Sequence, residues 1–489
     1  MQMVDRSRLL IQRHTAVLIR VGVIGGLVGV LCVIGYGATM PRMDPVFVLL
    51  AVILPVGFFA LVKHVEMGLV AMLLSGVLVR FRLPTGTASE IVISLLMCVV
   101  TLGLWVVRML VVDKRLRLKS VPANFPLLAF MVTVFISLGW GRVYRDVFVH
   151  DAGSPFVSVA SALVMVLLPV TYLLVVNLVR DIRWLQAMVW VFLGEGLVSL
   201  IIALVIDLGI GPTSTISRLV YYNGLVWINT HGLFSMWYLS LAVALAMFNR
   251  RLHWLVRVGL LVYAAGWVYW GFFQRITWLS GWVPAFVTLA VVAFLRSKWL
   301  FVVLAMVIVV GAGGYYFRTE FQGESERSGV TRLAAYEVNW RVTSKHLLFG
   351  TGPAGYASYY MSYFPTEGMA THSNYIDIIA QTGVVGSFFI LWFFGAQAWG
   401  GYKLRLKLKG RRDFAEGLSA AVLAGTVGCL VAMALGDWLF PFAYTQGIVG
   451  FDAAMVNWFF MAAIWALGYS LDLIPGRARQ WSSARGTDA

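Results

Sequence analysis

The chain has 489 residues, of which 60% are hydrophobic and only 12% are charged, and its mean hydropathy is +0.83. This composition excludes an ordinary soluble globular domain and indicates a polytopic membrane protein. The formal charge of +16 does not indicate nucleic-acid binding, because Lys and Arg occur in short clusters between apolar runs, with no RNA-binding aromatic motif beside them. Cys32, Cys98 and Cys429 lie inside apolar runs, so we interpret them as small buried hydrophobes.

Fourteen apolar runs approach the length that crosses roughly 30 Å of hydrocarbon. The first is interpreted as an uncleaved helix, because it is long enough to span and no A-x-A cleavage site follows. The third is short, so a re-entrant pair with its neighbour across the KHVE turn is an alternative. The runs lie near 16–37, 45–62, 65–80, 90–112, 123–140, 156–178, 184–207, 230–248, 255–273, 277–295, 299–316, 374–400, 416–436 and 453–473.

The positions of Lys and Arg predict the topology. With the N-terminus in the cytoplasm, 26 of the 38 Lys and Arg residues fall on the cytoplasmic side, as the positive-inside rule requires. Both termini are then cytoplasmic, and the polar segments 209–232, 271–282 and 317–373 share the outer face. We therefore predict an all-α polytopic membrane protein with about 14 transmembrane helices, in which 317–373 is a long extracytoplasmic loop between helices 11 and 12.

Four arginines on the predicted outer face are candidates for binding an anion, since the positive-inside rule selects against them there: Arg218, Arg275, Arg332 and Arg341. Arg275 lies between two apolar runs, where a desolvated guanidinium needs an anionic partner such as a phosphate or diphosphate. The alternative is that Arg275 reaches lipid head groups or pairs with a carboxylate.

His372 is the candidate general base. It follows Thr371, a plausible N-cap, and opens the helix that runs through Asn374 and Tyr375. The positive end of a helix dipole disfavours an imidazolium, so we expect a neutral histidine that can accept a proton. The alternative is a polar residue at the membrane interface without a catalytic role.

Four other polar features are less specific. Two of them have both a structural and a functional interpretation, and the other two are interpreted as structural. The tyrosine-rich run 355–364 is either an interfacial aromatic belt or a platform for sugar rings. The segment 350–355 lacks the GK[ST] of a P-loop and is interpreted as a tight turn. Glu195, within the seventh run, is either functional or holds helices together through a hydrogen bond. There is no DxD, HExxH or His/Cys cluster, and the acidic residues of 320–326 are interpreted as a solvated loop, so no metal is expected.

Taken together, these segments resemble the O-antigen ligase and polymerase superfamily of polytopic glycosyltransferases. Members typically carry an Arg at the start of a late outer-face helix, followed by a long periplasmic loop. The loop opens on an Arg and an aromatic, passes through Pro-Leu-x-Gly-x-Gly and closes on His-Asn-x-Tyr-Leu, before a helix with a Gly-x-x-Gly end. The matching residues are Arg218 in SRLVYYNGLVWINTHGLFSMW, Arg275 in QRITWLSGW, Arg332, Tyr336, Gly350 and Gly352 in RLAAYEVNWRVTSKHLLFGTGPAGY, and His372, Tyr375, Gly383 and Gly386 in HSNYIDIIAQTGVVG.

The resemblance covers about 210–390 and departs from the family pattern at two positions. Leu347 stands in place of Pro, and Ser373 in place of Asn, with Asn374 one position later. The second departure leaves open which side chain orients the base. The implied division is N-terminal transmembrane helices in 1–208, an O-antigen ligase-like catalytic region in 209–400, C-terminal transmembrane helices in 401–474 and a cytoplasmic tail in 475–489.

The resemblance implies a glycosyltransferase of the bacterial cytoplasmic membrane. It would move a glycan from undecaprenyl diphosphate to a hydroxyl of lipid A, a glycan or a protein on the outer face, inverting the anomeric centre without metal or cofactor. His372 would be the base, and Arg275, Arg332 and Arg218 would hold the diphosphate. We therefore expect His372, Arg275 and Arg332 to line one cavity. Possible supporting residues are Asn374, Tyr375, Tyr336 and Arg341.

Two alternatives of different kinds stay open. One is another enzyme of the same superfamily, either a polymerase that joins polysaccharide repeat units or a ligase that glycosylates proteins. The other is a non-enzymatic flippase for lipid-linked oligosaccharides, which would bind the polyprenyl diphosphate without reacting. The concentration of polar residues on one face argues against alternating access, which uses sites near the middle of the membrane.

Overall fold

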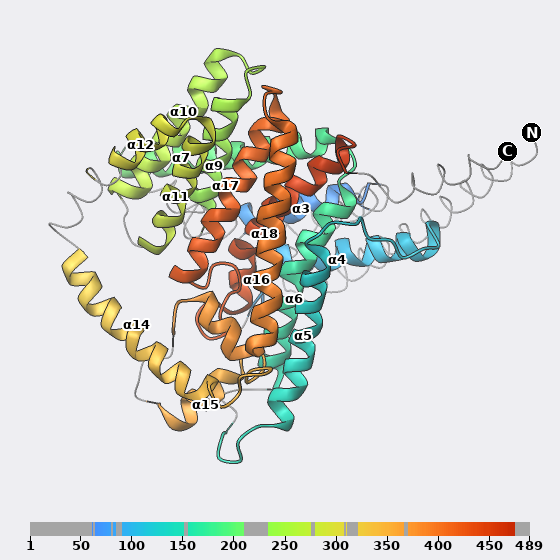
Figure 1. Ribbon diagram of the computed structural model, residues 1–489, viewed down its shortest axis with the longest axis vertical. Helices are drawn as coiled ribbons and strands as arrows, with labels where there is room; N and C mark the ends of the chain where they lie inside the picture. Colours follow the sequence, from blue (N-terminus) through green and yellow to red (C-terminus); the bar gives the residue numbers. More distant parts are fainter. Residues whose placement is uncertain are drawn as a thin grey trace, which may run out of the picture. The chain divides into compact units, whose positions relative to one another are not determined.

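The computed structural model describes residues 61, 64–79, 82–84, 90–150, 155–209, 233–274, 279–307, 310, 321–365 and 370–474. Most of these residues are helical (Figure 1). In chain order the elements are α3 (Glu66–Leu78), β1 (Arg82–Pro84), β2 (Glu90–Val92), α4 (Ile93–Val107), η1 (Arg108–Val112), α5 (Asn124–Val143), α6 (Pro155–Leu178), α7 (Ile182–Asp207), α9 (Phe234–Phe248), α10 (Trp254–Val268), η3 (Tyr269–Gln274), α11 (Leu279–Arg296), α12 (Lys298–Val307), α14 (Phe321–Thr343), α15 (Gly355–Tyr363), α16 (Asn374–Leu408), α17 (Phe414–Leu435), η5 (Gly447–Gly450) and α18 (Phe451–Ser470).

Long apolar helices confirm the predicted class of helical polytopic membrane protein. Four shorter apolar helices, α3, α9, α11 and α12, also coincide with predicted runs. The runs 16–37 and 45–62 lie outside the described residues apart from residue 61, so the number of fourteen spans stays a prediction. Within the described residues, seven helices are long and apolar enough to cross a membrane: Ile93–Val112, Asn124–Val143, Phe156–Leu178, Ile182–Asp207, Asn374–Leu408, Phe414–Leu435 and Gly447–Ser470.

One small feature departs from an all-helical fold. Strands β1 and β2 form an antiparallel pair in which Pro84 lies opposite Glu90. A salt bridge of 3.1 Å between Arg82 Nη1 and Glu90 Oε2 crosses this pair. The pair is three residues long in each strand, so it does not change the fold class.

The chain forms two compact units. The first comprises Met1–Met72 and Leu96–Leu118, and within it Gly68 of α3 lies against the side chain of Thr101 of α4. The second comprises Leu73–Leu95 and Lys119–Ala489, and all the features described below belong to it. The predicted division at residues 208 and 400 stays a prediction.

Several buried polar side chains of the second unit form hydrogen bonds across helices, which offsets the cost of burying them. Gln397 of α16 accepts hydrogen bonds from Tyr172 of α6 (2.8 Å) and Trp465 of α18 (2.6 Å), and its amide donates to the carbonyl of Met461 (2.7 Å). Trp237 of α9 donates to Asn457 of α18. The bonds of Gln397 fix α16 against α6 and α18, and the bond from Trp237 joins α9 to α18.

The predicted loop 317–373 contains two helices in its described part. Helix α14 is polar on average and is not one of the membrane-spanning candidates, whereas α15 is short and tyrosine-rich. Both lie at the end of the bundle where α5 ends and α16 begins (Figure 1). The sequence between them includes the expected tight turn, in which Gly350 and Gly352 adopt φ values of +70° and +86°. The turn interpretation of 350–355 is therefore confirmed.

This turn is seated on a break in α16. Gly383, with a φ of +67°, interrupts the helix and leaves main-chain groups on both sides without helical partners. The amides of Thr351 and Gly352 donate to the carbonyls of Ala380 and Gln381 (2.9 and 3.1 Å). From the other side of the break, the amide of Val384 donates to the carbonyl of Leu347 (2.8 Å). The loop thus replaces the missing helical bonds and fixes the first half of α16.

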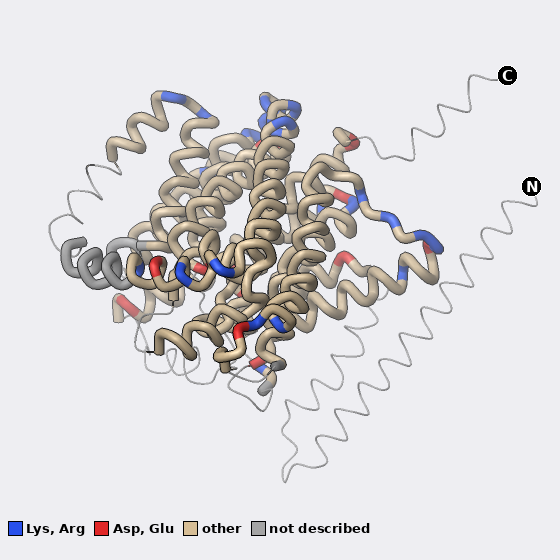
Figure 2. The backbone as a smooth tube through the Cα atoms, turned by 60° about the horizontal axis from the view of Figure 1, so that its bottom comes forward, with Lys and Arg blue, Asp and Glu red and all other residues tan. Residues whose placement is uncertain are grey.

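Segments assigned to the same side by the positive-inside rule contact one another. At the start of α16, Tyr363 of α15 donates to Asp146 of the loop after α5 (2.7 Å). At the other end of this 35-residue helix, the amide of Arg250 donates to the carbonyl of Arg412 (2.9 Å). Lys and Arg gather where α16 ends and α17 begins (Figure 2), at residues 403–412. The grouping agrees with the predicted topology, whose outward direction stays a prediction.

Candidate active site

The candidate base has a carboxylate beside it. His372 lies immediately before α16, and Asp437 lies just after α17. His372 Nδ1 is 3.5 Å from Asp437 Oδ1, and the side chains are 45% and 5% exposed, respectively. The pair therefore combines an accessible imidazole with a buried acidic group, which is the arrangement expected of a base held by a third group.

Asp437 is anchored by the loop that follows it. Thr445 Oγ1 donates to Oδ2 (2.5 Å), and the amide of Phe442 lies 3.4 Å from the same oxygen. Burial by itself raises the pKa of Asp437, but the hydrogen bonds from His372 and Thr445 outweigh it and hold the pKa below its usual value. The carboxylate is therefore ionised at neutral pH and can accept a hydrogen bond from the imidazole N–H.

The start of α16 differs from the prediction. Thr371 is not the N-cap, because the helix begins at Asn374 with Ser373 in the capping position. Thr371 Oγ1 instead donates to Asp377 Oδ1 (2.6 Å) in the first turn. His372 itself has a φ of +48°, a left-handed conformation that is unfavourable for a residue with a Cβ. Buried neighbours on both sides hold it there.

Asn374 and Tyr375 act as anchors for this segment. Asn374 is fully buried; its amide donates to the carbonyl of Phe440 (2.7 Å), and its oxygen accepts from the amide of Leu439 (2.9 Å). Tyr375 donates to the carbonyl of Leu430 on α17 (2.9 Å). These contacts fasten the start of α16 to the segment that carries Asp437. Asp437, and not Asn374, is thus the side chain positioned to orient His372.

The predicted arginines are not all brought to this place. Arg332 is partly buried on α14, and its Nε is buried without a hydrogen-bond partner among the described residues. No hydrogen bond or ion pair joins Arg332 to His372 within that part of the chain. Arg341 forms an exposed salt bridge of 2.6 Å with Glu337 one turn away. Arg218 and Arg275 lie outside the described residues, so the shared cavity stays a prediction.

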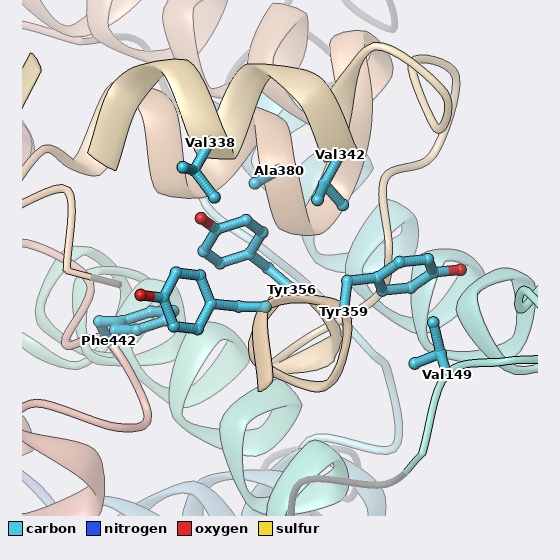
Figure 3. Packing of buried hydrophobic residues seen from close by; sticks show 8 residues of the cluster. Val149, Val338, Val342, Tyr356, Tyr359, Ala380 and Phe442 are labelled. Carbon is cyan, nitrogen blue, oxygen red and sulfur yellow. The ribbon is translucent and has the colours of Figure 1, made fainter. Parts of the chain in front are cut away.

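Three of the four tyrosines in 355–364 are buried inside the protein and do not form an interfacial aromatic belt. Tyr356, Tyr359 and Tyr360 are buried in a hydrophobic cluster between α14, α15 and α16 (Figure 3). Val338 and Val342 of α14 and Ala380 of α16 complete its core, whereas Tyr336, two residues before Val338, is partly buried. The aromatic belt is therefore wrong for these three residues, and the sugar platform is wrong for Tyr356 and Tyr360, because α14 covers the face that they present. The cluster instead packs the helix of Arg332 against the helix that His372 precedes.

Glu195 has the packing role that was one of its two interpretations. Its carboxylate accepts hydrogen bonds from Ser199 in the next turn of α7 (2.6 Å) and from Tyr238 of α9. The side chain is buried, and these bonds join two helices in the interior of the unit. Glu195 does not belong to the cluster at the start of α16.

Asp437 was not selected from the sequence, although a signal for it was present. It is a lone carboxylate directly after the run 416–436, at a position that the topology places on the outer face. Charged residues beside an apolar run are costly and often functional. The rule that selected Glu195, which treats ionisable residues in or beside spanning segments as functional candidates, would have selected it.

The site contains no arrangement that suggests a metal. Among the residues that the structure describes, no group of three or more His, Cys, Asp and Glu side chains is placed to hold a metal ion. The polar groups at the start of α16 are an imidazole, a buried carboxylate and hydroxyls. This set can accept and position a proton.

The fold and a family comparison define the class of protein. Residues 234–391 match the protein-family model described as O-Antigen ligase, which covers about a third of the chain. In a helical chain with several apolar helices long enough to span a membrane, this match supports a membrane enzyme of the O-antigen ligase and polymerase type. The resemblance to that superfamily is therefore confirmed over a region that contains Arg275, Arg332 and His372. No curated protein matches the chain significantly.

Asp437 gives a first testable prediction. Replacing Asp437 with Asn is expected to lower kcat for glycan transfer by about 10- to 100-fold, because an amide can donate to Nδ1 and stabilise the tautomer whose Nε2 cannot accept a proton. Since the folded pKa of Asp437 is depressed, its stabilising contact is complete above the unfolded pKa and is lost only as the pH falls through the folded value. The measurement is kcat of the purified wild type and D437N at neutral pH, where Asp437 is ionised, and equal values for the two proteins would contradict the assignment.

Proposed function

We propose that the protein transfers a glycan from undecaprenyl diphosphate to an acceptor hydroxyl at the outer face of the bacterial inner membrane. The observation that carries this proposal is the His372–Asp437 pair, with an accessible imidazole and a buried, anchored carboxylate. The family match over 234–391 supports the type of reaction.

The pair suggests the path of the proton. Asp437 accepts a hydrogen bond from the Nδ1–H of His372. This bond favours the tautomer in which Nε2 is unprotonated and can accept a proton. Nε2 takes the proton of the acceptor hydroxyl as that oxygen bonds to the anomeric carbon of the glycan. The bond from this carbon to the diphosphate oxygen breaks at the same time, and its electron pair leaves with the diphosphate. A single displacement of this kind inverts the anomeric centre.

The leaving diphosphate gains charge and needs cationic donors. Arg332 supports this role because its buried Nε has no hydrogen-bond partner among the described residues, and a buried donor of this kind requires an acceptor. Arg275 and Arg218 are proposed as the other members of the clamp. Guanidinium groups stabilise such charge through paired hydrogen bonds.

Asn374 and Tyr375 are proposed as positioning residues, since they bind main-chain carbonyls of the α17 region and not the imidazole. Tyr336 and Arg341 lie on α14 beyond Arg332, and they support the placement of that helix. The acceptor of the glycan is lipid A, another glycan or a protein.

The test uses purified protein in nanodiscs with undecaprenyl-diphosphate-linked glycan and each class of acceptor in turn. Transfer to lipid A or a protein identifies a ligase, and elongation of the glycan identifies a polymerase. Liposomes that hold the donor in one leaflet test the flippase alternative. Translocation without transfer in any assay, with a His372→Ala variant equal to wild type, would exclude the proposed reaction.

A further inference from the structure

A cavity of about 290 Å³ lies beside the turn that supports α16. Its walls are the end of α5, the start of α6, the turn 350–355 and α15, all within the second compact unit. Neither His372 nor Asp437 is among its described lining residues. The polar side chains in its wall belong to Arg142, Arg145, Ser158, Thr351, Ser358 and Tyr359.

Two guanidinium groups give this cavity its charge. Arg142 and Arg145 both line it, and no acidic residue is among the described lining residues. Arg145 Nη2 donates to the carbonyl of Val149 (2.7 Å), which fixes the side chain where the loop after α5 turns back. The nearby Asp146 is engaged elsewhere, since the hydrogen bond from Tyr363 lowers the pKa of its carboxyl. Two guanidinium groups thus line the cavity, and groups of this kind donate hydrogen bonds to phosphate.

The rest of the wall suits a sugar. Ser158 and Ser358 supply hydroxyl-bearing side chains, and Tyr359 supplies part of an aromatic ring. Tyr359 is fixed, because its hydroxyl accepts from the amide of Asp146 (3.2 Å) and its ring packs edge-on against His346. The volume is just below the roughly 300–1,000 Å³ of ordinary ligand pockets. It admits one sugar ring with a phosphate and is too small for a lipid chain.

We propose that this cavity binds a phosphorylated sugar, with Arg142 and Arg145 on the phosphate and the serine hydroxyls on the ring. The site goes beyond the proposed transfer reaction and does not depend on it. The turn 350–355 lines the cavity and also donates to the broken part of α16. The occupant therefore contacts the same turn that holds the helix following His372.

Binding is measured by isothermal titration calorimetry on the full chain in neutral phosphatidylcholine nanodiscs, with glucose 1-phosphate, glucose and inorganic phosphate as separate probes. Glucose 1-phosphate should bind at least about tenfold more tightly than either other probe, because only it uses both kinds of contact. Arg142→Gln and Arg145→Gln should each weaken it by about tenfold or more. Equal affinity for glucose and glucose 1-phosphate would overturn the proposal.

Matched variants separate the cavity from general effects of charge and folding. Lys345→Gln removes one positive charge from an exposed position nearby and should leave binding unchanged. Ser158→Trp fills the cavity and keeps both arginines, so it should abolish binding. Val159→Trp places the same bulk on the exposed face of α6 (40% exposed) and should not affect binding. Binding retained by both Ser158→Trp and Arg145→Gln, in variants that unfold at the wild-type temperature, also overturns the proposal.

The result is distinguishable from failure of the proposed reaction. Sugar-phosphate binding that depends on Arg145, in a protein that transfers no glycan, supports this site and removes the proposed function. Glycan transfer with no arginine-dependent binding of glucose 1-phosphate supports the proposed function and removes this site.

Discussion

Replacement of His372 by Ala is expected to lower glycan transfer by about 10²- to 10⁴-fold, which is the usual contribution of a general base. The loss should be in kcat, with little change in the affinity for the lipid-linked donor, because the imidazole acts on the acceptor hydroxyl. The measurement is a transfer assay with the purified variant in nanodiscs, together with donor binding at equilibrium.

The matched control for this prediction is His150→Ala. His150 is exposed in the loop after α5, and its main-chain amide, which the substitution keeps, donates to Ser362 (3.0 Å). This variant should retain wild-type transfer. If His372→Ala retained more than about a tenth of the wild-type kcat, the imidazole would not be the base.

Replacement of Gly383 by Ala is expected to destabilise the protein by more than about 2 kcal/mol. The φ of +67° is costly for any residue with a Cβ, and that atom would collide with the main chain of Leu348. The loop would have to leave the break in α16 and so expose the carbonyls of Ala380 and Gln381. The measurement is the midpoint of thermal unfolding in detergent, with the yield of monodisperse protein.

Gly395→Ala is the control in the same helix. A Cβ at Gly395 has no atom within 4 Å, and the helix is regular there. This substitution should be neutral or stabilising by about 0.5–1 kcal/mol, since Ala favours helices over Gly. Equal unfolding midpoints for the two variants would contradict the role assigned to the break.

The predictable part of the fold follows from the membrane environment. Hydropathy alone located the long apolar helices, because a spanning segment must be apolar over nearly its whole length. The clusters of Lys and Arg assigned the loop after α5 and the segment 317–373 to one side, and the structure shows a contact between these two segments. Helix α14 was not foreseen in the loop 317–373, since its sequence is polar and has no strong helical periodicity. It is placed there by the tyrosines on which it packs.

The candidate site was predictable only in its local part. His372 stands in a short motif at the start of a helix, and such a motif is visible without any tertiary contact. Asp437 lies far along the chain, after another span, and reaches His372 only because Asn374 binds the segment around Phe440. A pairing of this kind depends on how two helices pack, which no local pattern encodes.

The sequence by itself determined the membrane class, the grouping of the loops, the superfamily resemblance and the candidate base, because each depends on composition or on neighbouring residues. The tertiary structure decided the partner of His372, the burial of Tyr356, Tyr359 and Tyr360, and the break at Gly383 that the turn 347–352 fills. These features depend on contacts between segments that lie far apart in the chain, and they exist only once the helices have packed.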